Sequence, residues 1–136
     1  MYEYALKEVT RVVDGDTIDV VFDLGFNIFL KERVRLAGID SPESRTRNLE
    51  EKELGLQAKK KLEQELDHAK LIVVQTKKDK GTGKYGRILG WLYLDGAAGS
   101  LNQELIDQGY AWPYEGGTKH TDLEELRQKR RKSFTS

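Results

Sequence analysis

Acidic and basic side chains occur close together in the segment Arg35–Glu43, whose sequence is RLAGIDSPE. The segment begins with the apolar and polar alternation typical of a half-buried strand, which a glycine and a proline then end. Asp40 and Glu43 therefore lie on the exit loop, three positions apart, near the guanidinium of Arg35. Folding does not require this combination, and loops on rigid strand ends commonly carry chemistry.

A further acid, Asp16, follows an Asp-Gly pair that is a strong signal for a tight hairpin. Period-2 counting places Asp16 on the same face as the apolar residues of the returning strand 17–22, which is unusual for an acid. Carboxylates suit Ca²⁺ or Mg²⁺, so Asp16 and Asp40 are candidate metal ligands, completed by water and a backbone carbonyl. A hairpin turn followed by a surface acid is the alternative interpretation.

Glu43 has the chemistry of a general base acting on a water molecule, and its alternative is a solvated loop acid. Arg35 and Arg87 each lie at an expected strand end. Two guanidiniums that converge on a phosphate would neutralise the charge that grows during phosphoryl transfer. Surface arginines paired with acids are the alternative for both residues.

Two other groups of residues could contact a nucleotide. Lys84 and Tyr85 stand beside Arg87 and offer a phosphate-binding and base-contacting surface. Tyr110, Trp112 and Tyr114 could stack on a base, although aromatic residues before a turn more often close the edge of a core.

The composition limits the possible classes of protein. A chain of 136 residues fits a single domain, 1–136, and its 38% hydrophobic and 34% charged residues describe a globular protein. The formal net charge is zero, so any polyanion must be bound by a local basic patch. No cysteine is present, and the two histidines, His68 and His120, stand far apart, which makes a zinc site improbable.

No apolar run approaches the ~20 residues of a membrane span, so we expect no membrane partner. The first residues carry no export signal. This slightly favours a cytoplasmic location, whereas removal of a signal from a secreted protein would leave the same sequence.

Hydrophobic periodicity predicts five strands and three helices. The expected strands are 4–13, 17–22, 28–37, 70–76 and 87–94. The expected helices are 51–69, 101–108 and a last one that begins near Thr121. Ser100 with Gln103, and Thr121 with Glu124, have the form of capping boxes. Short strands with a helix after the third predict an α+β fold with a five-stranded OB-type barrel, and a sandwich is the main alternative.

The segments Val13–Thr17, Arg35–Glu43 and Lys84–Arg87 together resemble the staphylococcal nuclease (thermonuclease) family in order and spacing. The resemblance covers nearly the whole chain, including the segment Gln108–Ala111. It implies an OB-type barrel with three helices and Ca²⁺-dependent hydrolysis of phosphodiesters in DNA and RNA. We expect a monomer that favours single-stranded substrate.

The resemblance also implies roles for individual residues. Asp16 and Asp40 would bind Ca²⁺ through their carboxylates and Ser41 through its backbone carbonyl, although a threonine is common at that position in the family. Glu43 would orient or deprotonate the attacking water. Arg35 would hold the scissile phosphate and stabilise its transition state.

Arg87 would share the phosphate with Arg35, while Lys84 and Tyr85 would contact a neighbouring phosphate. The loop 110–117 does not align cleanly with the family's pair of nucleotide-contacting tyrosines, and Tyr114 is the nearest equivalent. A catalytically silent OB module that binds nucleic acid or a protein is the alternative function. Asp16, Asp40 and Glu43 argue against it, because their negative charge would weaken the binding of a polyanion unless a cation were present.

Overall fold

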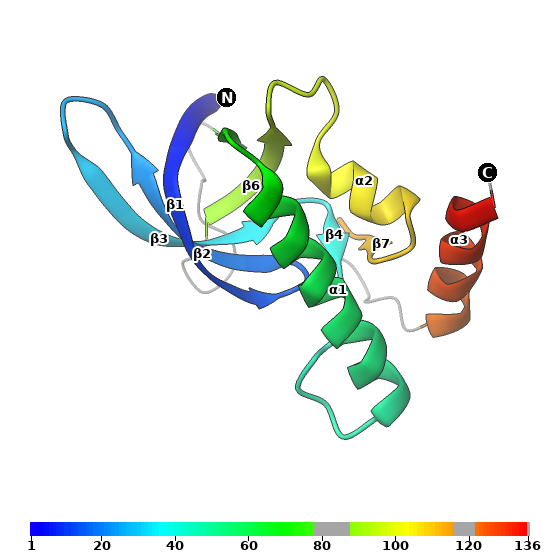
Figure 1. The fold of residues 1–136 in the computed structure, drawn as a ribbon. Coiled ribbons are helices and arrows are strands. Elements are labelled where there is room, and N and C mark those ends of the chain that lie inside the picture. The colour runs from blue at the N-terminus through cyan, green and yellow to red at the C-terminus, as the bar shows by residue number, and fades with distance from the viewer. Residues whose placement is uncertain (78–87, 116–121, 136) are drawn as a thin grey trace.

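The computed structural model describes residues 1–77, 88–115 and 122–135, and these form a mixed barrel with three helices (Figure 1). The strands are β1 (Tyr2–Asp14), β2 (Thr17–Asp23), β3 (Phe29–Leu36), β4 (Ile39–Asp40), β5 (Ile72–Thr76), β6 (Ile88–Leu94) and β7 (Trp112–Pro113). The helices are α1 (Leu49–His68), α2 (Leu101–Asp107) and α3 (Leu123–Thr135). The predicted α+β fold with an OB-type barrel and three helices is confirmed.

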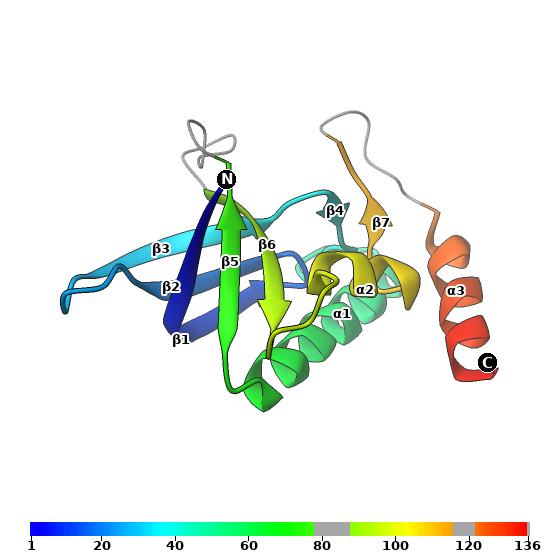
Figure 2. The same ribbon diagram turned by 90° about the horizontal axis from the view of Figure 1, so that it is seen from above.

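Five strands close the barrel in the order β1-β2-β3-β6-β5. β1 closes the barrel, because its residues 2–5 pair with β5 and its residues 5–14 pair with β2. The pairing of β3 with β6 is parallel, and the other barrel pairs are antiparallel. Two parallel strands need a long connection between them. The connection from β3 to β6 contains β4, α1 and β5. Figure 2 shows α2 beside the barrel, with α3 beyond it.

The alternating apolar residues of β2 face the interior, as the sequence predicts. Ile18, Val20 and Phe22 are buried, together with residues from the other strands and from the helices. Helix α1 contributes the predicted stripe Leu54, Ala58, Leu62 and Leu66, which is buried along its length. Each large aliphatic side chain removed from water contributes roughly 1.5–3 kcal/mol, so this stripe fixes α1 against the barrel.

The helix ends only partly follow the predicted capping pattern. Ser100 Oγ accepts a hydrogen bond from the Gln103 backbone N–H, as predicted, but the Gln103 side chain pairs with Asp107 and does not return to the cap. At the start of α3, Asp122 accepts a hydrogen bond from Glu125 N–H, and the capping box of Thr121 with Glu124 stays a prediction. Thr121 lies outside the described residues.

The stretch after α2 was expected to be an aromatic loop, and it instead contains the short strand β7. Trp112 and Pro113 pair with β4. The Trp112 side chain is buried, and its Nε1–H donates to the Asp122 carbonyl at 3.1 Å. Trp112 therefore closes the core, which was the structural alternative for this residue. No helix within residues 1–77, 88–115 and 122–135 is long and apolar enough to cross a membrane.

An ion pair on the barrel surface makes the stability depend on pH. Arg33 donates two hydrogen bonds to the Asp19 carboxylate, at 2.7 and 3.1 Å, and these hold the pKa of Asp19 below its ordinary value. Because the folded pKa is lower than the unfolded one, the contribution is complete above the unfolded pKa of about 4. It is lost as the pH falls through the folded pKa.

We expect Asp19→Asn to lower the free energy of unfolding at pH 7 by up to about 1 kcal/mol, since partly exposed ion pairs rarely contribute more. The difference from wild type should shrink in acid, as measured by urea unfolding at pH 7 and below pH 4. Asp23→Asn is the matched control, because the Asp23 carboxylate accepts from the Gly25 backbone N–H and forms no ion pair with a described residue, and asparagine keeps that acceptor. An equal loss at both pH values would contradict the assignment.

Candidate active site

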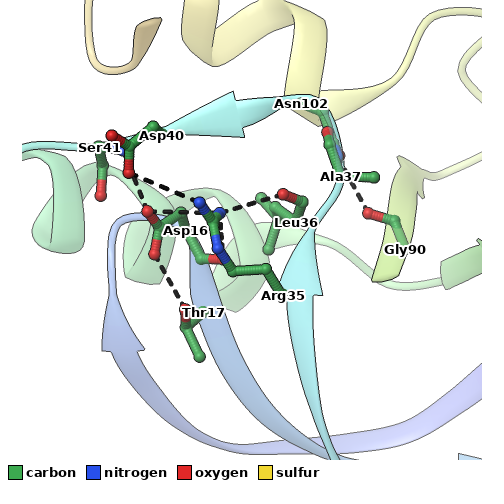
Figure 3. Close-up of polar contacts among 9 residues, drawn as sticks. All are labelled: Asp16, Thr17, Arg35, Leu36, Ala37, Asp40, Ser41, Gly90 and Asn102. Carbon is green, nitrogen blue, oxygen red and sulfur yellow. Dashed lines mark hydrogen bonds and ion pairs between the residues drawn. The ribbon is translucent and has the colours of Figure 1, made fainter. Parts of the chain in front are cut away.

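Two acids from separate strand ends meet at one arginine (Figure 3). Asp16 lies in the turn between β1 and β2, Arg35 near the end of β3, and Asp40 in β4. Arg35 Nη1 is 3.4 Å from Asp16 Oδ2, and Arg35 Nη2 is 3.5 Å from Asp40 Oδ1. The structure therefore brings together three of the residues that the sequence singled out.

Both acids of the cluster are buried. Asp16 and Asp40 are only 8% and 3% exposed, and Arg35 is a cation within ion-pair distance of both. Buried charges are costly unless they are paired and hydrogen-bonded. Two buried carboxylates side by side provide the kind of oxygen ligands to which a hard cation binds.

Hydrogen bonds fix the orientation of Asp16. Ser41 N–H donates to Asp16 Oδ2 at 3.0 Å, and Thr17 Oγ1 donates to Asp16 Oδ1 at 2.9 Å. Leu36 N–H donates to the Asp16 carbonyl at 2.8 Å, which ties the hairpin to the end of β3. Arg35 Nη1 donates to the Leu36 carbonyl at 3.2 Å. Both charged partners are therefore held by backbone groups before any ligand arrives.

The oxygen atoms at this site match the preferences of Ca²⁺. Within the described residues no group of three or more His, Cys, Asp or Glu side chains could hold a metal. The available ligands are the carboxylates of Asp16 and Asp40 beside Ser41. The Ser41 Oγ is buried, and no described residue hydrogen-bonds to it. Hard cations accept two carboxylates when a backbone carbonyl and water complete the shell. The residues therefore fit the predicted ion.

A glycine allows the hairpin to approach this loop. A Cβ atom on Gly15 would lie 2.7 Å from Ala58 Cβ and 3.0 Å from Ser41 Oγ. Real Cβ atoms do not pack that closely, so a larger residue would push the turn away from α1. The Asp-Gly pair therefore provides the turn and also the close packing next to Asp16.

Glu43 follows Asp40 by three positions on the loop that leaves β4, and it is exposed. Its backbone N–H donates to Glu51 Oε2 at 3.2 Å, and a Cβ on Gly55 would overlap the Glu43 carbonyl. Ser44 Oγ is hydrogen-bonded to the Asp14 carboxylate. The loop is thus held between α1 and the β1–β2 hairpin, and the carboxylate of Glu43 stays accessible to solvent.

The pairing of β4 with β7 carries Tyr114 to the site. Its N–H donates to the Gly38 carbonyl at 2.9 Å, and its ring centre is 5.9 Å from Arg35 Cζ. Arg35 and Tyr114 are 79 positions apart in the sequence, so sequence patterns do not predict this contact. Arg87, Lys84 and Tyr85, by contrast, lie outside the described residues.

Asn102 is a supporting residue that the sequence analysis missed. It is 2% exposed, and its Nδ2 donates to the carbonyls of Ala37 and Gly90 at 2.8 and 3.0 Å. Its Oδ1 accepts from Leu92 N–H at 3.0 Å. Asn102 therefore ties the connection between β3 and β4 to β6. Arg35 lies in β3 and Asp40 in β4, on either side of this connection. An amide among the apolar residues of a short helix was the available signal.

Comparison with known protein families gives a match that spans most of the chain. The family described as Staphylococcal nuclease homologue matches residues 33–134. The chain belongs to this family. The match includes Arg35, Asp40 and Glu43, and Asp16 lies before its first residue.

Individual relatives of this nuclease-family chain are similar at moderate identity. Endonuclease YncB of Bacillus subtilis is 34% identical over 128 residues, which cover 90% of the chain and 56% of the relative. Protein ParB of Escherichia coli is 34% identical over 127 residues, 88% of the chain and 63% of the relative. Micrococcal nuclease of Shigella flexneri is 33% identical over 124 residues, which cover 86% of the chain and 63% of the relative. The chain thus spans about 60% of the length of these relatives.

We expect Asn102→Ala to lower the free energy of unfolding by about 2–4 kcal/mol. It would remove the partner of the Leu92 N–H and of the Ala37 carbonyl, whereas the Gly90 carbonyl still accepts from Ala37 N–H. Each unsatisfied buried group costs roughly 1–3 kcal/mol. Chemical denaturation measures the loss. Gln103→Ala is the neighbouring control, because the Gln103 side chain makes an exposed contact with Asp107 and should change stability by less than about 0.5 kcal/mol. Equal effects of the two changes would refute the role given to Asn102.

Proposed function

We propose that this protein is a Ca²⁺-dependent nuclease that hydrolyses phosphodiester bonds in DNA and RNA. The observation that carries the proposal is the convergence of Asp16, Arg35 and Asp40 from three strand ends on one partly buried point. A carboxylate pair beside a guanidinium combines a site for a hard cation with a binding group for phosphate. Membership in the staphylococcal nuclease family and the names of two relatives, an endonuclease and a micrococcal nuclease, support it.

The carboxylates of Asp16 and Asp40 and the carbonyl of Ser41 would hold the ion. When bound, Ca²⁺ would act as a Lewis acid on phosphate oxygen and neutralise developing negative charge. The hydrogen bonds from Ser41 N–H and Thr17 Oγ1 keep Asp16 oriented for this role. Preformed ligands reduce the reorganisation that binding requires.

Arg35 and Arg87 act on the scissile phosphate. Their guanidiniums donate hydrogen bonds to its non-bridging oxygens, and the interaction strengthens as negative charge accumulates in the transition state. Arg35 is held for this by the Leu36 carbonyl and by the two acids. Glu43 accepts a proton from the attacking water, whose oxygen forms the new bond to phosphorus while the ester oxygen on the opposite side departs.

The remaining predicted residues would bind the substrate chain. Lys84 and Tyr85 contact a neighbouring phosphate, and Tyr114, next to Arg35, contacts the adjoining nucleoside. The charged groups all contact phosphate, which DNA and RNA share. The proposed enzyme therefore discriminates little between deoxyribose and ribose. Single strands fit better than duplexes because their unpaired bases can reach aromatic side chains. We propose that a monomer performs the reaction.

Removal of the metal should abolish activity. With Ca²⁺ the protein should release acid-soluble nucleotides from single-stranded DNA and from RNA, and excess chelator should stop the release until Ca²⁺ is restored. A catalytically silent binding module would give the opposite result, with tight single-strand binding in chelator and no cleavage in Ca²⁺. That outcome would overturn the proposed function.

Loss of the general base should slow the reaction without unfolding the protein. We expect Glu43→Gln to lower kcat at least ~10²-fold, because glutamine cannot accept the proton from water. The exposed position of Glu43 predicts unchanged stability, which urea unfolding checks. Glu63→Gln is the matched control, since Glu63 is exposed near the opposite end of α1. Undiminished turnover in the Glu43→Gln protein would eliminate the assigned role.

A further inference from the structure

A groove between α1 and α3 is lined by positive charge. It encloses about 370 Å³, and its walls include Gln57, Lys60, Lys61, Tyr110, Arg130 and Phe134. Three of these side chains are cations, and no carboxylate belongs to the lining among the described residues. Acids and bases are equal in number in the whole sequence. This local excess of positive charge therefore marks the groove as a place for an anion.

Arg130 forms the inner wall of this groove and is incompletely paired. Its Nε–H donates to the Gly109 carbonyl at 3.0 Å, its Nη1 contacts Gln57 Oε1, and its guanidinium lies 4.1 Å from the centre of the Tyr110 ring. Its Nη2 is buried and has no hydrogen-bond partner among the described residues. No described carboxylate lies within ion-pair distance, and burial lowers the pKa of Arg130.

A purely structural role explains only part of this arrangement. The bond to the Gly109 carbonyl joins α3 to the end of α2, and a Cβ on Gly109 would lie 2.8 Å from the Arg130 backbone nitrogen. A neutral donor would serve that purpose without the cost of burying a charge. The structural role also gives no reason for Lys60 and Lys61 to line the same groove. Lys61 Nζ forms an ion pair with Glu65 Oε1 at 2.7 Å, whereas Lys60 forms no ion pair with a described residue.

The groove lies close to the candidate active site through α1. Gln57 lines the groove, and the next residue, Ala58, packs against Gly15 beside Asp16. Successive helical residues project about 100° apart, so the groove and the active site occupy neighbouring faces of one helix turn. The Phe134 ring at the groove is 82% exposed, and an exposed aromatic ring beside cations suits a stacked base.

We propose that the groove binds a second phosphate of the nucleic acid chain, with Arg130, Lys60 and Lys61 as its cations and Phe134 stacking on the attached base. This assignment rests on the proposed function, because it takes the nucleic acid substrate as the ligand. The groove contacts a part of the substrate strand away from the bond that is cut. Substrates long enough to cross α1 gain affinity there. Substrates of two nucleotides do not reach it.

Removal of charge from the groove tests the assignment. In chelator, where no cleavage occurs, Lys60→Gln/Lys61→Gln should weaken the binding of a single-stranded oligonucleotide on the order of tenfold at low salt. The slope of log Kd against log salt should fall by about two, one for each lysine. Lys59→Gln/Lys70→Gln removes the same charge outside the groove lining and should change little. Equal losses from the two pairs would overturn the proposal.

The source of the phosphate is tested by two further probes. Inorganic phosphate and the oligonucleotide should each shift the nuclear magnetic resonance signal of Arg130 Nε–H. Phe134→Ala should weaken binding of the oligonucleotide several-fold and leave binding of inorganic phosphate unchanged. A response to inorganic phosphate without any response to the oligonucleotide would assign the groove to a free anion and overturn the nucleic acid role.

Turnover measurements distinguish a failure of the groove assignment from a failure of the proposed nuclease function. In Ca²⁺, Lys60→Gln/Lys61→Gln should raise KM for a long single strand and leave the cleavage of a dinucleotide unchanged. A fall in dinucleotide cleavage would overturn the assignment of the groove. Oligonucleotide binding that depends on the groove, in a wild-type protein that cleaves nothing, would refute only the nuclease activity.

Discussion

The central constraint of this molecule is the sharing of one guanidinium by two buried carboxylates. Arg35 lies within ion-pair distance of both Asp16 and Asp40, and the three side chains come from separate strand ends. Charged groups in a protein interior are costly unless they are held in good pairing geometry. The surrounding backbone must therefore hold them in place, and much of the local structure does so.

Three kinds of support meet at this cluster. The hairpin is tied to β3 through the Asp16 carbonyl and to the following loop through Ser41 N–H. Gly15 allows the hairpin and α1 to pack together, and Asn102 fixes the chain between β3 and β4 to β6. A closed barrel suits this purpose because each strand end is held by neighbours on both sides, so that side chains from distant positions keep a fixed geometry.

Charge is balanced over the chain and unbalanced locally. The formal net charge is zero, yet two buried carboxylates meet at Arg35, while the groove between α1 and α3 is lined by three cations among the described residues. A protein that handles a polyanion can thus attract it by local patches without a basic overall composition. The proposed Ca²⁺ ion would reconcile the acidic centre with a phosphate substrate, because it turns a repulsive site into an attractive one.

The sequence by itself determined the local elements and suggested the chemistry of the site. Period-2 alternation identified the burial of β2 and the unusual inward position of Asp16, and helical spacing identified the buried stripe of α1, because both patterns follow from backbone geometry alone. The residue types in the segment Arg35–Glu43 were enough to suggest a metal and a phosphate. Together with the other motifs they indicated the family, and the fold followed from it.

Only the tertiary structure decided which distant residues touch. The short pair β4–β7, the approach of Tyr114 to Arg35, the three hydrogen bonds of Asn102 and the groove at Arg130 all join segments that lie far apart in the chain. Such contacts leave no periodic trace in the sequence. They are selected when the barrel closes, because burial of the shared core fixes the register of every strand and helix at once.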